Sequence, residues 1–457
     1  MEEEVGMIRV RLVRPGRVMC AVVMLMTGSV WLTPDARAED LPGRDGKVHN
    51  GVLSCAGSHC HGNEAPRQGG VVGRDEHAIW RDYDVHNQAY KVLKNDVSKR
   101  IAANLGLGKP AHESDQCLDC HADNVPVDLR GSKFKLSDGV GCEACHGGSE
   151  NWYTAHDAGP GHQANLDNGM YPTDDPVARA RLCISCHYGD ETKFVNHRLM
   201  GAGHPRMSFE LAIFTESQPR HFTVDADYTD RGKQAPQGAQ VWAIGQAVEV
   251  ERVLDALLDP DRGRDGIWPE FVLFDCDACH HPMSEGRWRA RPSTGLGPGM
   301  ARLNDSSFLM LRHALVGVSP NKAKALALEL RALHVATGAG SAASKKATLA
   351  LRARALDAIG VLREWQPDVA SIRRVLKSLV DEGLAGEYLD YAGAEQAMLA
   401  VQVLAFNLYT LDAIEEDAIG QVGEIARGLT AALENPETYD RSVVVNSFRK
   451  VKAATNP

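Results

Sequence analysis

The stretch "GCEACHGG", residues 141–148, holds two cysteines separated by two residues and followed at once by a histidine. The pattern recurs in "CLDCH" (117–121), "CISCH" (183–187) and "CDACH" (276–280). Two thiols at this spacing can bond to two vinyl groups on one porphyrin edge, and the adjacent imidazole then lies under the iron. Cys-x-x-Cys-His is therefore the signature of c-type haem attachment. The four stretches predict four covalently bound haem groups.

A fifth stretch, "LSCAGSHCHG" (53–62), has four residues between Cys55 and Cys60 before His61. The two extra residues can bulge outward while both sulfurs still reach the porphyrin, so we expect a fifth haem here. The alternative is a lone disulfide that closes a very short loop, with His61 adjacent by coincidence.

The cysteines form five pairs once Cys20 is set aside. The predicted haem-binding residues are Cys55, Cys60, Cys117, Cys120, Cys142, Cys145, Cys183, Cys186, Cys276 and Cys279. The predicted proximal iron ligands are His61, His121, His146, His187 and His280. Disulfides, redox motifs and zinc sites do not require a histidine after every pair. Five haem c groups are therefore expected.

Residues 1–38 have the character of an export signal. Arginines precede an apolar stretch at 19–32, and "DARA" (35–38) ends in an Ala-x-Ala cleavage site. The predicted location is the periplasm, and an uncleaved anchor helix is the alternative. The chain has a formal net charge of −10 and no segment that interleaves basic with aromatic residues, which argues against nucleic-acid binding.

The second axial ligands are predicted from the remaining histidines. Residues 74–107 are rich in helix formers and predict a helix that carries His77 and His86. His156 follows a flexible Gly-Gly, and His204 lies between Gly203 and Pro205 on a local bend. The predicted distal ligands are His77, His86, His156 and His204.

Other side chains are weaker candidates for these positions. His197 competes with His204, whereas His162 and His221 lie in loops and are less favoured. His281 is expected to face solvent or a propionate. His313 and His334 are expected to be structural or surface residues. Methionine ligands and a five-coordinate iron remain open alternatives, and the methionines concerned are Met200, Met207 and Met283.

The chain after the last motif changes character. Residues 282–300 are rich in Pro and Gly, and 301–457 contain no cysteine and much Ala and Leu. Within 368–383, apolar residues recur at helical spacing, and they are Ile372, Val375, Leu376, Leu379 and Val380. In 322–337, Leu326, Leu330 and Leu333 share one helical face. Residues 394–414 are apolar almost all round and are expected to form the central buried helix. We therefore predict a mainly α fold: a pentahaem domain at 39–285 with short helices and long loops, a linker at 286–300, and a helical bundle at 301–457. The bundle covers the haem region or mediates docking or homo-oligomerisation.

The motif set resembles the multihaem c-type cytochromes of the superfamily that holds the nitrifier tetrahaem electron-transfer cytochrome and hydroxylamine oxidoreductase. The resemblance rests on about half of the chain, in "SCAGSHCHG", "HAIWRDYDVHNQAY", "CLDCHA", "SDGVGCEACHGGSENW", "CISCH", "MGAGHPRMSFEL" and "CDACHHP". It implies closely packed haems and mostly bis-histidine irons. This chain departs from the tetrahaem protein in having five motifs and a longer first spacing.

The predicted function is electron transfer between redox proteins, because bis-histidine irons leave no open position for a substrate. A membrane-attached electron-transfer complex is one candidate partner. The alternative is an oxidoreductase that acts on a small nitrogen or sulfur compound at one five-coordinate haem. The absence of a Cys-x-x-Cys-Lys motif and of eight motifs argues against known enzymes of that kind, so an enzyme is the less favoured interpretation.

Overall fold

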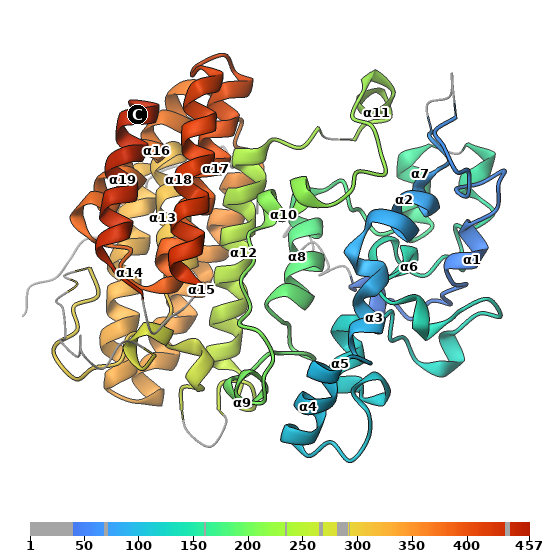
Figure 1. The fold of residues 1–457 in the computed structure, drawn as a ribbon, viewed down its shortest axis with the longest axis horizontal. Helices are drawn as coiled ribbons and strands as arrows, with labels where there is room; N and C mark the ends of the chain where they lie inside the picture. Colours follow the sequence, from blue (N-terminus) through green and yellow to red (C-terminus); the bar gives the residue numbers. More distant parts are fainter. Residues whose placement is uncertain are drawn as a thin grey trace, which may run out of the picture. The chain divides into compact units, whose positions relative to one another are not determined.

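The structure is a computed structural model in which Glu39–Pro457 forms one compact unit. It describes residues 40–67, 72–159, 161–233, 235–264, 268–280, 291, 293–434 and 439–457. Within these ranges the regular structure is helical, and pairing between extended segments is limited to three isolated β-bridges. The prediction of a mainly α fold is confirmed (Figure 1). The predicted signal peptide at 1–38 and most of the residues from 281 to 292 lie outside the described residues.

The cysteine-rich part consists of short helices joined by long loops. Its α-helices are α1 (Val52–Cys55), α2 (Glu76–Tyr83), α3 (Ala89–Val92), α4 (Asp96–Leu105), α5 (Asp115–His121), α6 (Cys142–His146), α7 (His162–Asp167), α8 (Pro176–His187), α9 (His197–Gly201), α10 (Leu211–Ser217) and α11 (Ala226–Asp230). The 3-10 turns are η1 (Pro42–Arg44), η2 (Val85–Gln88), η3 (Ala111–Glu113), η4 (Val127–Leu129), η5 (Leu136–Asp138), η6 (His156–Ala158), η7 (Phe271–Leu273) and η8 (Cys276–Ala278).

The single helix predicted over 74–107 is wrong, because the segment is divided into α2, η2, α3 and α4. Asp84 ends α2 in an extended conformation, and its carboxylate accepts a hydrogen bond from the backbone N–H of His86. Asn95 caps α4 in the same way by accepting from the N–H of Ser98. Short polar side chains that bond to the backbone compete with helical hydrogen bonds, and two of them interrupt this segment.

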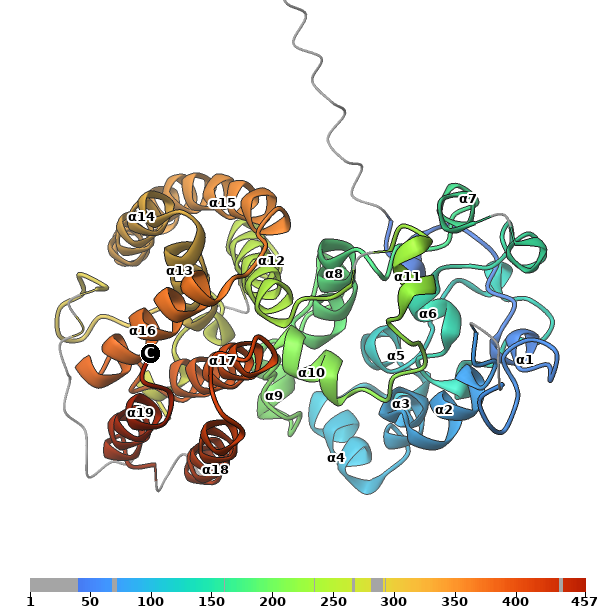
Figure 2. The ribbon, with the colours of Figure 1, turned by 90° about the horizontal axis from the view of Figure 1, so that it is seen from above.

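The second part is a bundle of longer helices. It consists of α12 (Gly238–Leu258), α13 (Ser306–Val318), α14 (Pro320–Gly338), α15 (Ser341–Arg363), α16 (Val369–Ala385), α17 (Tyr391–Thr410), α18 (Glu416–Leu433) and α19 (Ser442–Thr455). Although α12 precedes the linker predicted at 286–300, it packs against α13, α15 and α17. Almost every residue of α12 is buried, because it lies between the bundle and α8 and α10 of the cysteine-rich part (Figure 2).

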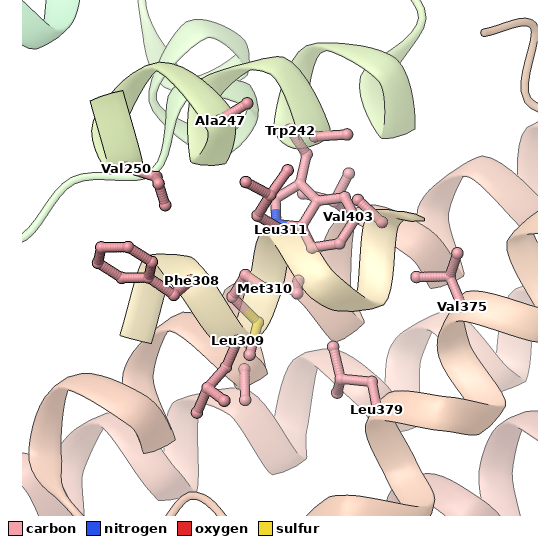
Figure 3. Close-up of a cluster of buried hydrophobic side chains, with 14 of the residues drawn as sticks. Trp242, Ala247, Val250, Phe308, Leu309, Met310, Leu311, Val375, Leu379 and Val403 are labelled. Atoms are coloured by element: carbon pink, nitrogen blue, oxygen red, sulfur yellow. The ribbon is translucent and has the colours of Figure 1, made fainter. Parts of the chain in front are cut away.

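The core of the bundle is formed where α12, α13, α16 and α17 meet. Figure 3 shows Trp242 of α12 beside Leu311 of α13, with Val375 of α16 and Val403 of α17 around them. Trp242 and Leu311 are completely buried. Burial of a large apolar side chain stabilises a fold by about 1.5–3 kcal/mol, so this cluster fixes how the helices pack.

The apolar patterns read from the sequence are confirmed in α14, α16 and α17. The predicted core residues of these first two helices are buried: Leu326, Leu330, Leu333, Ile372, Val375, Leu376, Leu379 and Val380. The third helix, predicted to be central, packs against α10, α12, α13, α16, α18 and α19.

None of the helices in the described part of the chain is both long enough and apolar enough to cross a membrane.

Candidate haem-binding site

The four regular motifs each lie on a helical turn. The motifs at 117–121, 142–146 and 183–187 end α5, α6 and α8, and the motif at 276–280 begins at η8. Counted from the N-terminus with 55–61 as the first, these four are the second to the fifth motifs. In a helical turn, residues three apart lie on the same side, so the two cysteines of each motif face one region. The turn at η8 is closed by the N–H of His280, which donates to the carbonyl oxygen of Cys276 at 2.7 Å.

The first motif adopts the same closure in spite of its longer spacing. Cys55 ends α1, and the N–H of His61 donates to the carbonyl oxygen of Cys55 at 3.1 Å. The extra residues fold into a turn in which the N–H of Cys60 donates to Gly57 at 2.8 Å. Both cysteines are free, so the disulfide considered for this pair is not formed. The histidine therefore has the same relation to the first cysteine as in the motif at η8.

Each motif histidine faces a second histidine from elsewhere in the chain. The distances between ring centroids are 6.2 Å for His61–His156, 6.5 Å for His121–His204, 6.2 Å for His146–His221, 6.2 Å for His187–His86 and 6.2 Å for His280–His197. An ion held between two imidazoles by metal–nitrogen bonds of about 2 Å separates the ring centroids by roughly 6 Å. The five pairs could therefore each hold one iron from both sides.

Three of the facing histidines are oriented through Nδ1. That of His86 lies 2.8 Å from the carboxylate of Asp84, and that of His156 lies 3.1 Å from the carbonyl oxygen of Trp152. That of His204 lies 2.8 Å from the carbonyl oxygen of Pro205. A partner on one ring nitrogen fixes the ring and leaves the other nitrogen for a metal.

The protonation state of two motif histidines, His146 and His187, also suits a metal ligand. Burial, aided by the neighbouring His221, lowers the pKa of His146 to about 4. Burial, aided by His86, lowers the pKa of His187 to about 4. Both rings are therefore neutral at pH 7, and the neutral imidazole is the form that binds a metal.

The structure differs from the predicted distal ligands at His77 and in the positions of His197 and His221. His77 lies against Trp80, with ring centroids 5.9 Å apart, and no motif histidine faces it within the described residues. His221 and His197, the less favoured candidates, occupy facing positions instead. His204 and His197 are not competitors, because α9 begins at His197 and ends before His204 and so directs them toward different motifs.

The number of motif histidines could have pointed to His197 and His221 from the sequence. Five motif histidines need five partners, and the break at Asp84 leaves His77 and His86 on separate elements. His197 is fixed by Glu270, whose carboxylate accepts from its backbone N–H at 2.9 Å. Glu270 also accepts from the N–H of Val272 in η7, just before the last motif. This carboxylate therefore ties His197 to the segment that carries His280.

The other side chains considered as ligands have different surroundings. Met200 and Met207 pack at the edge of an apolar cluster that includes Ile101 and Leu199. His162 lies 3.0 Å from the carboxylate of Asp174. Met283 and His281 lie outside the described residues.

The two bundle histidines are structural, as expected. The hydroxyl of Tyr388 lies 2.5 Å from Nε2 of His313, and Ser378 lies 2.9 Å from its Nδ1. His334 lies 3.0 Å from the carboxylate of Asp305. Both histidines are 1% exposed, so neither reaches the motifs.

The motifs lie against one another in pairs. The thiols of Cys55 and Cys142 interact, as do those of Cys120 and Cys186. Glu143, inside the third motif, accepts hydrogen bonds from the backbone N–H groups of Asn50 and Gly51 just before the first motif. The first motif is therefore held beside the third, and the second beside the fourth.

The bundle holds the fifth motif. The hydroxyl of Tyr391 in α17 donates to the carbonyl oxygen of His280 at 2.7 Å. Arg302 donates to Asp275 at 2.6 Å and to Asp390 at 2.8 Å. Arg441 pairs with Asp277, between the two cysteines, at 2.6 Å. A role for the bundle follows from these contacts, because it fixes the polypeptide on either side of Cys276.

Paired cysteines and facing histidines in this arrangement could hold haem groups. In comparison with known families, residues 54–147 match the model of cytochrome c554 and c-prime. This similarity supports a c-type cytochrome that binds haem c covalently and takes part in electron transfer. No curated protein and no solved structure matches the chain.

Proposed function

We propose that this protein is an exported multihaem c-type cytochrome that transfers electrons between redox partners and carries five haem c groups. The observation that supports it best is the set of five facing histidine pairs, one for each motif. We extend the similarity found at 54–147 to the superfamily of the nitrifier tetrahaem cytochrome and hydroxylamine oxidoreductase on the strength of the motifs elsewhere in the chain.

The residues of the chain would divide the work in a simple way. The ten motif cysteines supply thioether bonds, and the motif histidines supply the proximal nitrogens. The proposed distal ligands are His156 for the first motif, His204 for the second, His221 for the third, His86 for the fourth and His197 for the fifth. Haem c supplies one-electron chemistry, whereas the protein sets its potential through ligands, burial and hydrogen bonds.

The pairing supports a carrier rather than an enzyme. A substrate that reacts at iron needs an open coordination position. In each of the five pairs a second imidazole occupies the side on which a substrate would bind. The two pairs of adjacent motifs, first with third and second with fourth, would bring their haem groups close enough together to form a path for electrons.

The partners would be other redox proteins that dock transiently, including a membrane-attached complex. The acidic chain suits a partner with basic residues around its own cofactor, since complementary charge speeds transient association. The proposed location is the periplasm, where the export signal predicted at 1–38 would deliver the chain.

The test is the haem content and spin state of protein matured in a periplasm competent for c-type haem attachment. Intact mass and the pyridine haemochrome assay should give five covalent haem groups per chain. Electron paramagnetic resonance of the oxidised protein should show low-spin iron throughout. A count of four, or a high-spin iron in the wild type, would contradict the pentahaem carrier proposed here.

A further inference from the structure

The helical hairpin formed by α14 and α15 has a charge opposite to that of the whole protein. Residues 320–363 contain eight Lys and Arg residues and two acidic residues, a formal charge of +6. The chain as a whole carries −10, so the remainder carries −16. Charges of both signs are sufficient to keep a helical surface soluble, so solubility does not explain the excess of basic residues in this hairpin.

The same hairpin exposes large apolar side chains in a regular pattern. Leu328 and Val335 lie seven residues apart on α14, and Leu349 and Leu356 lie seven apart on α15. Their exposed fractions are 70%, 51%, 51% and 39% in that order. Residues seven apart on a helix share a face, so each helix presents a pair of apolar side chains to the outside.

The two apolar pairs lie on one side of the hairpin. Leu330 of α14 and Leu351 of α15 are buried toward the core, which fixes the inner side of each helix. An ion pair of 2.9 Å between Glu329 of α14 and Arg354 of α15 marks the sides on which the two helices face each other. The remaining, outer side of both helices carries the four apolar residues, which we call the outer strip. Figure 2 shows α14 and α15 side by side at the edge of the bundle, with α12 and α13 inside them.

Three lysines beside the outer strip are available to bind an anion. Lys324, Lys345 and Lys346 are exposed and form no ion pair within the described part of the chain. The hairpin's two acids are neutralised internally, Glu329 by Arg354 and Asp357 by Lys322. The long aliphatic stem of lysine can lie along apolar surface while its ammonium group reaches a polar layer.

We propose that the outer face of the α14–α15 hairpin binds the surface of an anionic lipid bilayer, with the outer strip at the level of the acyl chains and the three lysines at the headgroups. Leucine on one face with lysine and arginine beside it is the pattern of helices that lie in the membrane interface. This proposal concerns where the protein resides and does not depend on the haem content proposed above.

Two other occupants fit the face less well. A second copy of the chain would bring the three unpaired lysines of each copy together, and like charges oppose association. A protein partner usually buries aromatic side chains at the centre of an interface, and residues 320–363 contain no Phe, Trp or Tyr.

The test is co-sedimentation of the mature holoprotein with lipid vesicles at low salt. We expect binding to vesicles of phosphatidylglycerol and phosphatidylcholine and much weaker binding to vesicles of phosphatidylcholine alone. The double variant Lys345→Gln/Lys346→Gln should weaken binding to the anionic vesicles on the order of tenfold, because each basic residue near the surface contributes to attraction. Leu328→Glu/Leu349→Glu should abolish it.

The controls lie on other helices of the bundle. Phe406→Glu removes an apolar side chain that is 49% exposed on α17, and Lys450→Gln/Lys452→Gln removes two exposed charges from α19. Neither should change binding. Absence of binding to anionic vesicles would overturn the proposal, as would equal losses in the hairpin and control variants. All variants share one N-terminus, so a retained anchor would raise binding to both lipids equally and would not imitate the expected result. Circular dichroism and haem content confirm that each variant is folded.

Discussion

The ring of His221 lies edge-on to the ring of His146, with centroids 6.2 Å apart, although one residue belongs to a polar loop and the other ends the short helix α6. Burial and the mutual proximity of the two rings lower the pKa of His146 to about 4. Two neutral imidazoles at this separation could hold one metal ion between them, which the composition of the loop before α11 does not suggest.

The first prediction concerns the ligands that were less favoured by sequence. His221→Ala and His197→Ala should keep all five haem groups, because covalent attachment depends on the cysteines. Each variant should convert one iron from low spin to high spin, as measured by electron paramagnetic resonance of the oxidised protein. His77→Ala is the matched control and should leave the spectrum unchanged. A change in the His77 variant together with an unchanged His221 variant would reverse our assignment.

The second prediction concerns the first motif. Cys60→Ala should lower the covalent haem count by one, since a thioether bond is lost and the turn around Gly57 no longer holds a second sulfur. Intact mass of the matured protein measures this directly. His59→Ala, a change at the neighbouring exposed histidine, should leave the count at five. A wild-type count that Cys60→Ala does not alter would mean that this motif binds no haem.

The third prediction concerns the contact between the bundle and the fifth motif. Arg302→Gln leaves Asp275 without its arginine partner and Asp390 with only the longer contact to Arg291, and both carboxylates are largely buried. Removing one partner of a buried ionic cluster costs about 3–5 kcal/mol. The free energy of unfolding of the holoprotein should fall by about that amount in chemical denaturation.

The control for this change is an exposed ion pair. Arg354→Gln breaks the pair with Glu329, in which the arginine side chain is 52% exposed. Exposed pairs contribute about 0–1 kcal/mol, so a small loss is expected. Similar losses in the two variants would show that Arg302 does not hold the fifth motif in place.

The fourth prediction concerns acid stability of the bundle. Although burial opposes it, hydrogen bonding and charge from His313 and Arg312 lower the pKa of Glu382 to about 2. Since the pKa is lower in the folded state than in the unfolded chain, Glu382 stabilises the fold above the ordinary glutamate pKa of about 4.3 and loses this effect as pH falls toward 2. Burial also lowers the pKa of His313, so its effect has the same sign and begins nearer pH 6.5.

The measurement is the midpoint of thermal unfolding between pH 7 and pH 2.5. The wild type should lose stability throughout this range, and Glu382→Gln should remove the part of the loss that falls below about pH 4.3. Asp381→Asn changes the neighbouring, half-exposed carboxyl, which pairs with Lys377 at the surface, and should leave the profile close to that of the wild type. A Glu382 variant whose profile matches the wild type would exclude this carboxyl as the cause.

The mainly α fold and the expected haem attachment motifs could be predicted from local sequence patterns. Cys-x-x-Cys-His is a local pattern, because two thiols must reach one porphyrin edge while the adjacent imidazole reaches the iron. A local pattern can be recognised from the sequence without knowledge of the fold. The apolar spacing of α14 and α16 is local for the same reason, since one helical face must be buried.

The identity of the histidines that face the motifs depends on the tertiary structure. The histidine that faces each motif histidine comes from another segment of the chain, so its identity depends on how loops and short helices are placed in space. Asp84 broke a helix that propensity favoured, and this separated His86 from His77. The packing of α12 against the bundle could not be predicted from the sequence either. A helix that is buried on all sides has no polar face, so its sequence does not indicate which helices lie next to it.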